Sequence, residues 1–179
     1  MAEIQVRSLS PRDVATLSQM DSSYHTDFVW QMDLQAAEKE SQVRFREIRL
    51  PRTMRVETPR DSATLAEDWK DRPAVLVAER DDDLLGYASL TTGTLPGGVL
   101  VTELVVARRF RRQGAATALL RAAQTWAGQH NCARMMIEMQ SKNYPAICMA
   151  QKLGFEFCGY NDRYYSNRDI AVFFARNVG

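Results

Sequence analysis

The sequence predicts an α/β (α+β) fold in which one mixed sheet carries helices. Strand-like and helix-like segments alternate along the second half of the chain as strand–helix–strand–helix–strand, which is typical of a sheet with crossover helices. Hydrophobic residues make up 45% of the chain and charged residues 25%, so there is enough apolar side chain for a core. The length of 179 residues suits one domain, and neither a repeat nor a linker interrupts it. We therefore expect a single domain over residues 1–179.

The N-terminal segment predicts a strand followed by a short helix. Residues 4–9 alternate between apolar and polar side chains, as a half-buried strand does. Ser10 then suits the N-cap of a helix and Pro11 its first turn, because proline lacks the N–H that a first helical residue leaves unpaired. We expect this helix to span residues 12–20.

A long β-hairpin is expected next. Residues 26–34 are strand-like, and residues 43–50 alternate cleanly between apolar and charged side chains, which predicts two strands with one wet face. We expect the ladder to end at Pro51, which has no N–H to donate. A basic, extended connector over residues 52–60 and a short helix over residues 62–69 complete the first half.

The second half of the chain is more regular. Apolar side chains recur with helical spacing over residues 115–129, and a second helix is expected from Tyr144 to Leu153, ended by Gly154 as its left-handed C′ residue. The predicted strands cover residues 74–79, 84–91, 99–106, 133–139, 155–160 and 170–176. The third of these is almost continuously apolar, which predicts a central strand.

Composition and charge exclude several classes of protein. Lys and Arg total 23 and Asp and Glu 22, a net charge of +1, so nucleic-acid binding through bulk charge is not expected. The three cysteines are odd in number and form no C-x-x-C pair, which predicts neither a disulfide framework nor a metal site: Cys132, Cys148 and Cys158. Free thiols, an N-terminus without an apolar leader and the lack of an apolar run of about 18 residues predict a cytoplasmic protein with no membrane partner.

One segment points to phosphate chemistry. The predicted central strand runs into a basic loop that opens a helix, and the junction reads Arg111-x-x-Gly114-x-Ala116. Such a turn directs several backbone N–H groups outward at the positive end of the helix dipole, where a pyrophosphate binds well. Small residues matter here because a phosphate reaches backbone N–H groups only where no bulky side chain intervenes. Arg108, Arg109 and Arg112 can add charge-assisted contacts to a further phosphate.

The same turn can also be explained without a phosphate. Its residues would then form a solvated basic turn whose alanines pack the helix on the sheet. The sequence has neither a G-x-x-x-x-G-K-S/T loop nor a G-x-G-x-x-G turn after its first strand, so nucleoside triphosphates and dinucleotides are disfavoured.

A second segment, Asn143-x-x-Ala146 followed by Gly154-Phe155, completes a pattern. Together with the Arg111-x-x-Gly114-x-Ala116 turn it resembles the GNAT superfamily of N-acetyltransferases, with the clear likeness over residues 74–160. The resemblance implies a central sheet of about six or seven strands splayed at its middle, helices on both faces, and an N-terminal β-hairpin insertion. It also implies acetyl-CoA as cosubstrate, lying in the gap between the two diverging strands.

The resemblance implies a set of acetyl-CoA contacts. Main-chain groups around Leu104 and Val106 would bind the pantetheine amides by strand addition. The residues implied to contact acetyl-CoA are Leu104, Val105, Val106, Arg111, Arg112, Gln113, Gly114, Ala115, Ala116, Asn143 and Ala146. Asn143 also suits a helix N-cap, and both roles can hold together.

The reaction implied is direct attack of a neutral amine on the thioester carbonyl. A carboxylate or a water chain would take the ammonium proton, and Glu103 is the first candidate because it is the one charge in residues 99–106. Glu138 is the second, and a backbone N–H near Val105 would stabilise the oxyanion. A glutamate that merely faces outward from the sheet is the alternative for Glu103.

The protonation of the leaving thiolate is less well defined. The family often places a tyrosine on its last helix for this purpose, but the corresponding residue here is Ala150. Tyr164, Tyr165 or Cys148 would substitute, with Tyr164 preferred, or the acid would be dispensable. The departure also keeps open a non-catalytic sensor that binds acyl-CoA.

A narrower likeness points to streptothricin acetyltransferases. It rests on Glu138-x-Gln140-x-x-Asn143, on the tail from Tyr165 to Phe174 and on the early hairpin. We expect the hairpin and connector, residues 26–60, to line the acceptor side. Candidate acceptor contacts are Tyr24, Phe28, Trp30, Arg46 and Arg55, although simple hairpin packing explains the aromatic residues equally well.

The expected function is therefore acetyl transfer to a primary amine of a small molecule or peptide, by a monomer or homodimer. The sensor is one alternative. Nucleic-acid binding through residues 108–112 is another, and the near-zero net charge argues against it.

Overall fold

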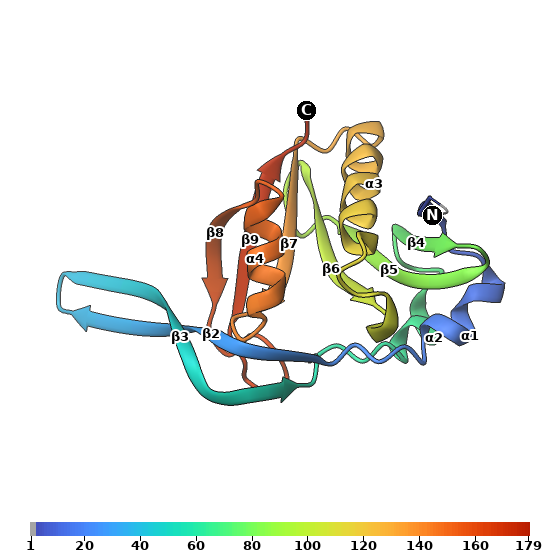
Figure 1. Ribbon diagram of the computed structural model, residues 1–179. Helices are drawn as coiled ribbons and strands as arrows, with labels where there is room; N and C mark the ends of the chain where they lie inside the picture. The colour runs from blue at the N-terminus through green and yellow to red at the C-terminus, as the bar shows by residue number, and fades with distance from the viewer. Residues whose placement is uncertain (1–2) are drawn as a thin grey trace.

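The computed structural model describes residues 3–179. A seven-stranded mixed sheet has the order β1-β4-β5-β6-β7-β9-β8, and a separate two-stranded sheet, β2-β3, extends beyond it (Figure 1). The strands of the large sheet are β1 (Gln5–Ser8), β4 (Ala74–Arg80), β5 (Asp83–Thr92), β6 (Gly98–Val106), β7 (Arg134–Gln140), β8 (Glu156–Asn161) and β9 (Ala171–Asn177). The predicted mixed sheet of six or seven strands is confirmed.

Helices cover both faces of the large sheet, as predicted. Helices α3 (Ala115–Gln129) and α4 (Tyr144–Lys152) pack into one core cluster on the first face. On the other face, α1 (Val14–Leu17) and α2 (Thr64–Asp68) pack Leu17 and Leu65 against Val77 and Tyr87, all four side chains fully buried. The two predicted N-terminal helices are shorter than expected, because each contributes one buried leucine rather than a full apolar stripe.

The hairpin differs in detail from the prediction. Its strands are β2 (Tyr24–Ala37) and β3 (Glu40–Val56), so the ladder continues past Pro51 and takes in part of the expected connector. The register changes there: Phe28 pairs with Arg49 but Thr26 pairs with Met54, which places Pro51 in a bulge where no N–H is required. The outer part of the hairpin extends away from the large sheet (Figure 1). The side chains of residues 34–42 are all exposed, so the sequence shows no alternation over these residues.

The middle of the large sheet is split. Strands β6 and β7 run parallel and pair only from Gly98 to Val101 on β6 and from Arg134 to Ile137 on β7. Beyond these residues β6 stays with β5, after a bulge between Ser89 and Leu90, and β7 stays with β9. The predicted splay at the centre of the sheet is therefore confirmed, and it opens toward the carboxyl ends of both strands.

Candidate functional site

The turn between β6 and α3 presents unpaired backbone donors. After a 3-10 turn, η2 (Arg108–Phe110), the chain enters α3 through Gly114, which has φ +94°. No side chain within residues 3–179 caps this N-terminus. The first backbone bond of the helix runs from Ala118 N to Gly114 O, so the N–H groups before it point outward with the helix dipole behind them.

Gly114 is required by conformation rather than by crowding within the protein. Among residues 3–179, a Cβ added to it would meet only Ile4 Cδ1, at 3.8 Å. Its left-handed φ is nevertheless one that side-chain-bearing residues adopt at a cost.

The arginines of this loop divide into two groups. Arg111 donates from Nε to Val106 O at 2.9 Å and from Nη2 to Asp21 O at 3.1 Å, so its guanidinium is turned back to the main chain, and burial lowers its pKa. Arg109 pairs with Asp83 at 2.8 Å. Arg108 and Arg112 have no ion pair within the described chain. The backbone N–H of Arg111 also has an acceptor, Arg108 O at 3.4 Å, so Arg111 is engaged through both its side chain and its main chain.

Backbone groups of β6 also face the gap. Ala107 N donates to Leu85 O on β5 at 2.9 Å, and Val105 O lies directly against Gly86 of the same strand. Because main-chain groups alternate in an antiparallel ladder, those of Leu104 and Val106 point the other way, toward β7. The main-chain groups of Val105 are directed at β5. The N–H expected to stabilise the oxyanion near Val105 therefore belongs to Leu104 or Val106.

Asn143 caps α4. Its Oδ1 accepts the N–H of Ala146 at 3.2 Å, which confirms the N-cap. Its Nδ2 donates to no acceptor among residues 3–179, so one donor remains for another partner. Ala146 lies in the first helical turn and is partly buried against the main core.

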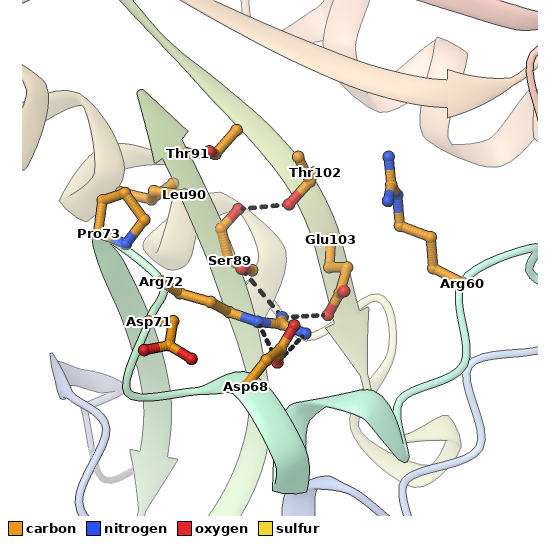
Figure 2. A pocket seen from close by; sticks show the side chains of 10 residues that line it. All are labelled: Arg60, Asp68, Asp71, Arg72, Pro73, Ser89, Leu90, Thr91, Thr102 and Glu103. Carbon is orange, nitrogen blue, oxygen red and sulfur yellow. Dashed lines mark hydrogen bonds and ion pairs between the residues drawn. The ribbon is translucent and has the colours of Figure 1, made fainter. Parts of the chain in front are cut away.

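Glu103 lines a cavity of about 240 Å³ beside the split (Figure 2). Its Oε2 accepts from Arg72 Nη1 at 2.9 Å and from the Tyr87 hydroxyl at 3.0 Å. Oε1 has no partner among the described residues. The side chains of Glu103 and Arg72 are 9% and 12% exposed, so the pair is strongly shielded from water but still borders the cavity.

Glu138 occupies the corresponding place on β7 and is more fully engaged. Its side chain is only 1% exposed. Oε1 accepts from Arg60 Nη2 at 2.7 Å and Nε at 3.1 Å, and Oε2 accepts from the Tyr164 hydroxyl at 3.1 Å. Burial and the neighbouring Glu138 carboxylate raise the pKa of Tyr164. Of the two carboxylates, Glu103 alone keeps an oxygen free.

The other candidates for a general acid are placed less favourably. Ala150 is fully buried in the main core, so a tyrosine there would displace core side chains. Tyr165 is buried, and desolvation raises the pKa of its hydroxyl. Cys148 is partly exposed on α4.

The hairpin residues expected to contact an acceptor do not line the cavity. The Tyr24 hydroxyl donates to Gln140 Oε1 at 2.8 Å, and Phe28 packs on Tyr144. Trp30 contacts Phe174, Arg46 pairs with Asp33, and Arg55 pairs with Glu57. Packing of the hairpin on α4 and β9, one hydrogen bond to β7 and local ion pairs therefore engage all five residues.

Sequence reasoning missed Arg60 and Arg72. Arg60 enters the site from the segment before α2, and Arg72 from the segment after it (Figure 2). Their carboxylate partners lie 78 and 31 residues further along the chain, so no local spacing links them. A short-range pattern has no means of finding either pair.

Metal binding and membrane crossing are two further functions that the structure bears on. Residues 3–179 contain no cluster of three or more His, Cys, Asp or Glu side chains arranged to hold a metal ion. In the same residues, no helix combines the length and the apolarity that a membrane crossing requires.

The chain is similar to known acetyltransferases. The model of the Acetyltransferase (GNAT) family matches residues 39–155. Streptothricin acetyltransferase of Streptomyces lavendulae is 24% identical over 166 residues, which is 90% of this chain and 86% of the relative. N-alpha-acetyltransferase of Saccharolobus solfataricus is 32% identical over 77 residues, 42% of this chain and 46% of the relative.

Solved structures share the fold. Nourseothricin acetyltransferase superposes with a TM-score of 0.80 at 23% identity, over 98% of this chain and 99% of that one. A Bacillus anthracis protein in complex with acetyl coenzyme A superposes with a TM-score of 0.77 at 16% identity, again over 98% and 99% of the two chains.

Proposed function

The chain belongs to the acetyltransferase (GNAT) family and is an acetyl-CoA-dependent N-acetyltransferase, and we propose that its acceptor is a primary amine on a small cationic molecule. The observation that carries the proposal is the end of the β6–β7 ladder at Val101, directly beside Glu103 and its cavity. The gap delivers a thioester from one side, and the cavity admits an amine from the other.

The cosubstrate fits this chain through main-chain donors. In our proposal the diphosphate of acetyl-CoA binds the outward N–H groups of residues 112–116, which no side chain of the described residues caps. The pantetheine arm adds to β6 through the main chain of Leu104 and the N–H of Val106, whose carbonyl already accepts from Arg111. The free Nδ2 of Asn143 donates to a carbonyl of the same arm. This scheme makes little demand on side chains, which suits a loop whose Arg111 is already engaged.

Glu103 acts as the base in this proposal. Its free Oε1 takes a proton from the acceptor ammonium, whose reference pKa is about 10.4 for a lysine-type amine. The neutral amine then attacks the thioester carbonyl and forms the C–N bond, and a main-chain N–H of β6 stabilises the oxyanion. Collapse of this intermediate breaks the C–S bond, the thiolate takes a proton from Tyr164, and Tyr164 regains a proton from the nitrogen of the new amide. Asp68, Asp71 and Glu103 line the same cavity together with Arg60 and Arg72, and the one negative charge in excess favours a cationic acceptor.

Tyr164 is the proposed proton donor to the departing thiolate. Its hydroxyl is held by Glu138, and a thiol with a reference pKa of about 8.5 requires little help to leave. The raised pKa of Tyr164 makes its hydroxyl a weaker acid toward the thiolate. We therefore expect this group to contribute less to the rate than Glu103.

Among amines, we favour a streptothricin-like acceptor over a protein N-terminus. The relative named for streptothricin aligns over 90% of this chain, whereas the relative named for N-terminal acetylation aligns over 42%. The longer alignment includes the hairpin and connector, residues 26–60, which we propose as part of the acceptor side because Arg60 borders the cavity.

The test is release of free CoA thiol from acetyl-CoA with a panel of amines. The panel contains streptothricin, free lysine, a peptide with a free N-terminus and the same peptide acetylated. Streptothricin should give the highest kcat/KM, and the acetylated peptide should give none. Preference for the free peptide would overturn the acceptor assignment, and binding of acetyl-CoA without turnover of any amine would indicate a sensor.

The double role of Asn143 can be separated by one substitution. Asn143→Asp keeps the oxygen that caps Ala146 N, because aspartate is as good an N-cap as asparagine, but it removes the Nδ2 donor. We expect an unchanged melting temperature and a KM for acetyl-CoA raised about five- to tenfold, the value of one hydrogen bond. Asn143→Ala should instead lower both stability and affinity. An unchanged KM in Asn143→Asp would limit Asn143 to capping.

A further inference from the structure

Two similar ion pairs lie where the large sheet splits, one on β6 and one on β7. We call the ends of these two strands beyond their shared ladder the two arms. Beyond Val101 and Ile137 no ladder connects β6 to β7. Glu103 follows on the β6 arm and is held by Arg72, while Glu138 follows on the β7 arm and is held by Arg60. Both arginines belong to one short stretch of chain, residues 60–72, which carries α2.

This stretch is itself fixed in place. Leu65 of α2 is fully buried against Leu17 and Val77. The Ser62 hydroxyl donates to Met20 O at 2.9 Å, and Arg72 makes a second pair with Asp68 at 2.7 Å within the same stretch. Residues 60–72 therefore form a stiff connection between two strands that otherwise have separate partners, and we name them the brace.

Stability alone is a poor explanation for these pairs. Burying a carboxylate costs several kcal/mol, and a buried ion pair often contributes no more than apolar side chains of the same size. Glu138 is 1% exposed and Glu103 9% exposed, so both carry this cost. The two pairs share a position: Glu103 and Glu138 are the first charged residues on β6 and β7 beyond the end of the β6–β7 ladder.

We propose that Arg60 and Arg72 are positioning residues that set the width of the gap between β6 and β7. The proposal rests on the proposed function, because the gap is where acetyl-CoA lies. Each arginine acts through a glutamate on one arm. With either pair broken, residues 60–72 no longer link the two strands beyond the end of their ladder, and acetyl-CoA must itself order the gap when it binds.

The brace makes a prediction that independent ion pairs do not make. Arg60 and Arg72 have different glutamate partners, so unrelated effects should add. Loss of either ion pair already detaches residues 60–72 from one of the two strands, so a second substitution should raise the Kd for acetyl-CoA little further. We expect Arg60→Gln and Arg72→Gln each to raise the Kd for acetyl-CoA about five- to tenfold, and the double variant to match the weaker-binding single variant.

The experiment is titration calorimetry with acetyl-CoA on the wild type, both single variants and the double variant, below all of their unfolding transitions. Arg12→Gln is the matched control, because it removes an exposed guanidinium whose ion pair with the buried Asp13 is long, at 3.8 Å, and its Kd should equal that of the wild type. Arg60→Lys should recover part of the lost affinity. Additive losses, or an unchanged Kd in either single variant, would overturn the brace.

Hydrogen exchange on the free protein separates this proposal from the proposed function. Residues 102–106 and 138–140 should exchange faster in both single variants than in the wild type, with or without any ligand. A wild type that binds no acetyl-CoA would overturn the proposed function, whereas unchanged exchange in these two segments would overturn the brace alone.

Discussion

Replacing Glu103 by glutamine is expected to lower kcat about 10²-fold at pH 7, the usual contribution of a general base. Glutamine keeps the shape of the side chain but cannot accept a proton on the atom corresponding to Oε1. The loss should shrink at pH 9, because the neutral form of a lysine-type amine is about 100-fold more abundant there than at pH 7. The measurement is kcat from pH 6.5 to 9.5 at saturating acetyl-CoA and amine.

Tyr87→Phe is the matched control for this prediction. It removes the second donor to Glu103 Oε2, at 3.0 Å, while keeping the carboxylate and the Arg72 pair. Any loss in this variant should be small and should have the same size at every pH. A loss in Glu103→Gln that is equally independent of pH would remove Glu103 as the base and return attention to a water chain.

The part of the site that is local in sequence could be predicted. The turn before α3 depends on Gly114 and on the uncapped first helical residues, and the N-cap of α4 depends on Asn143 and Ala146 three residues apart. Short-range rules of helix capping and backbone conformation act over this distance. The predicted bounds of α3, residues 115–129, agree with the structure for the same reason.

The part of the site that depends on tertiary contacts could not be predicted. Glu103 stands out as a single charge in an apolar strand, but its pairing with Arg72 arises only when α2 packs across β5 and β6. Pro51 ends a strand by local rules, yet a bulge lets β3 continue past it. The cavity likewise forms from β5, β6 and the stretch around α2 together, and no one of these segments predicts it.

Replacing Gly114 by valine is expected to raise the Kd for acetyl-CoA at least tenfold, or about 1.4 kcal/mol. Gly114 has φ +94°, and a β-branched residue there costs about 1–2 kcal/mol, so the turn should rearrange and its N–H groups should no longer converge. Titration calorimetry with acetyl-CoA measures the effect. An unchanged Kd would count against the assignment of this turn to the diphosphate.

Gly114→Asn separates the two reasons for glycine at this position. Asparagine tolerates the left-handed region far better than valine, and a Cβ at residue 114 would meet only Ile4 Cδ1 at 3.8 Å in the protein. If conformation is the requirement, this variant should keep most of the affinity for acetyl-CoA. If the diphosphate must approach the bare Cα, Gly114→Asn should bind as poorly as Gly114→Val. Because the protein leaves room for the Cβ, we expect conformation to dominate and the asparagine variant to bind more tightly than the valine variant.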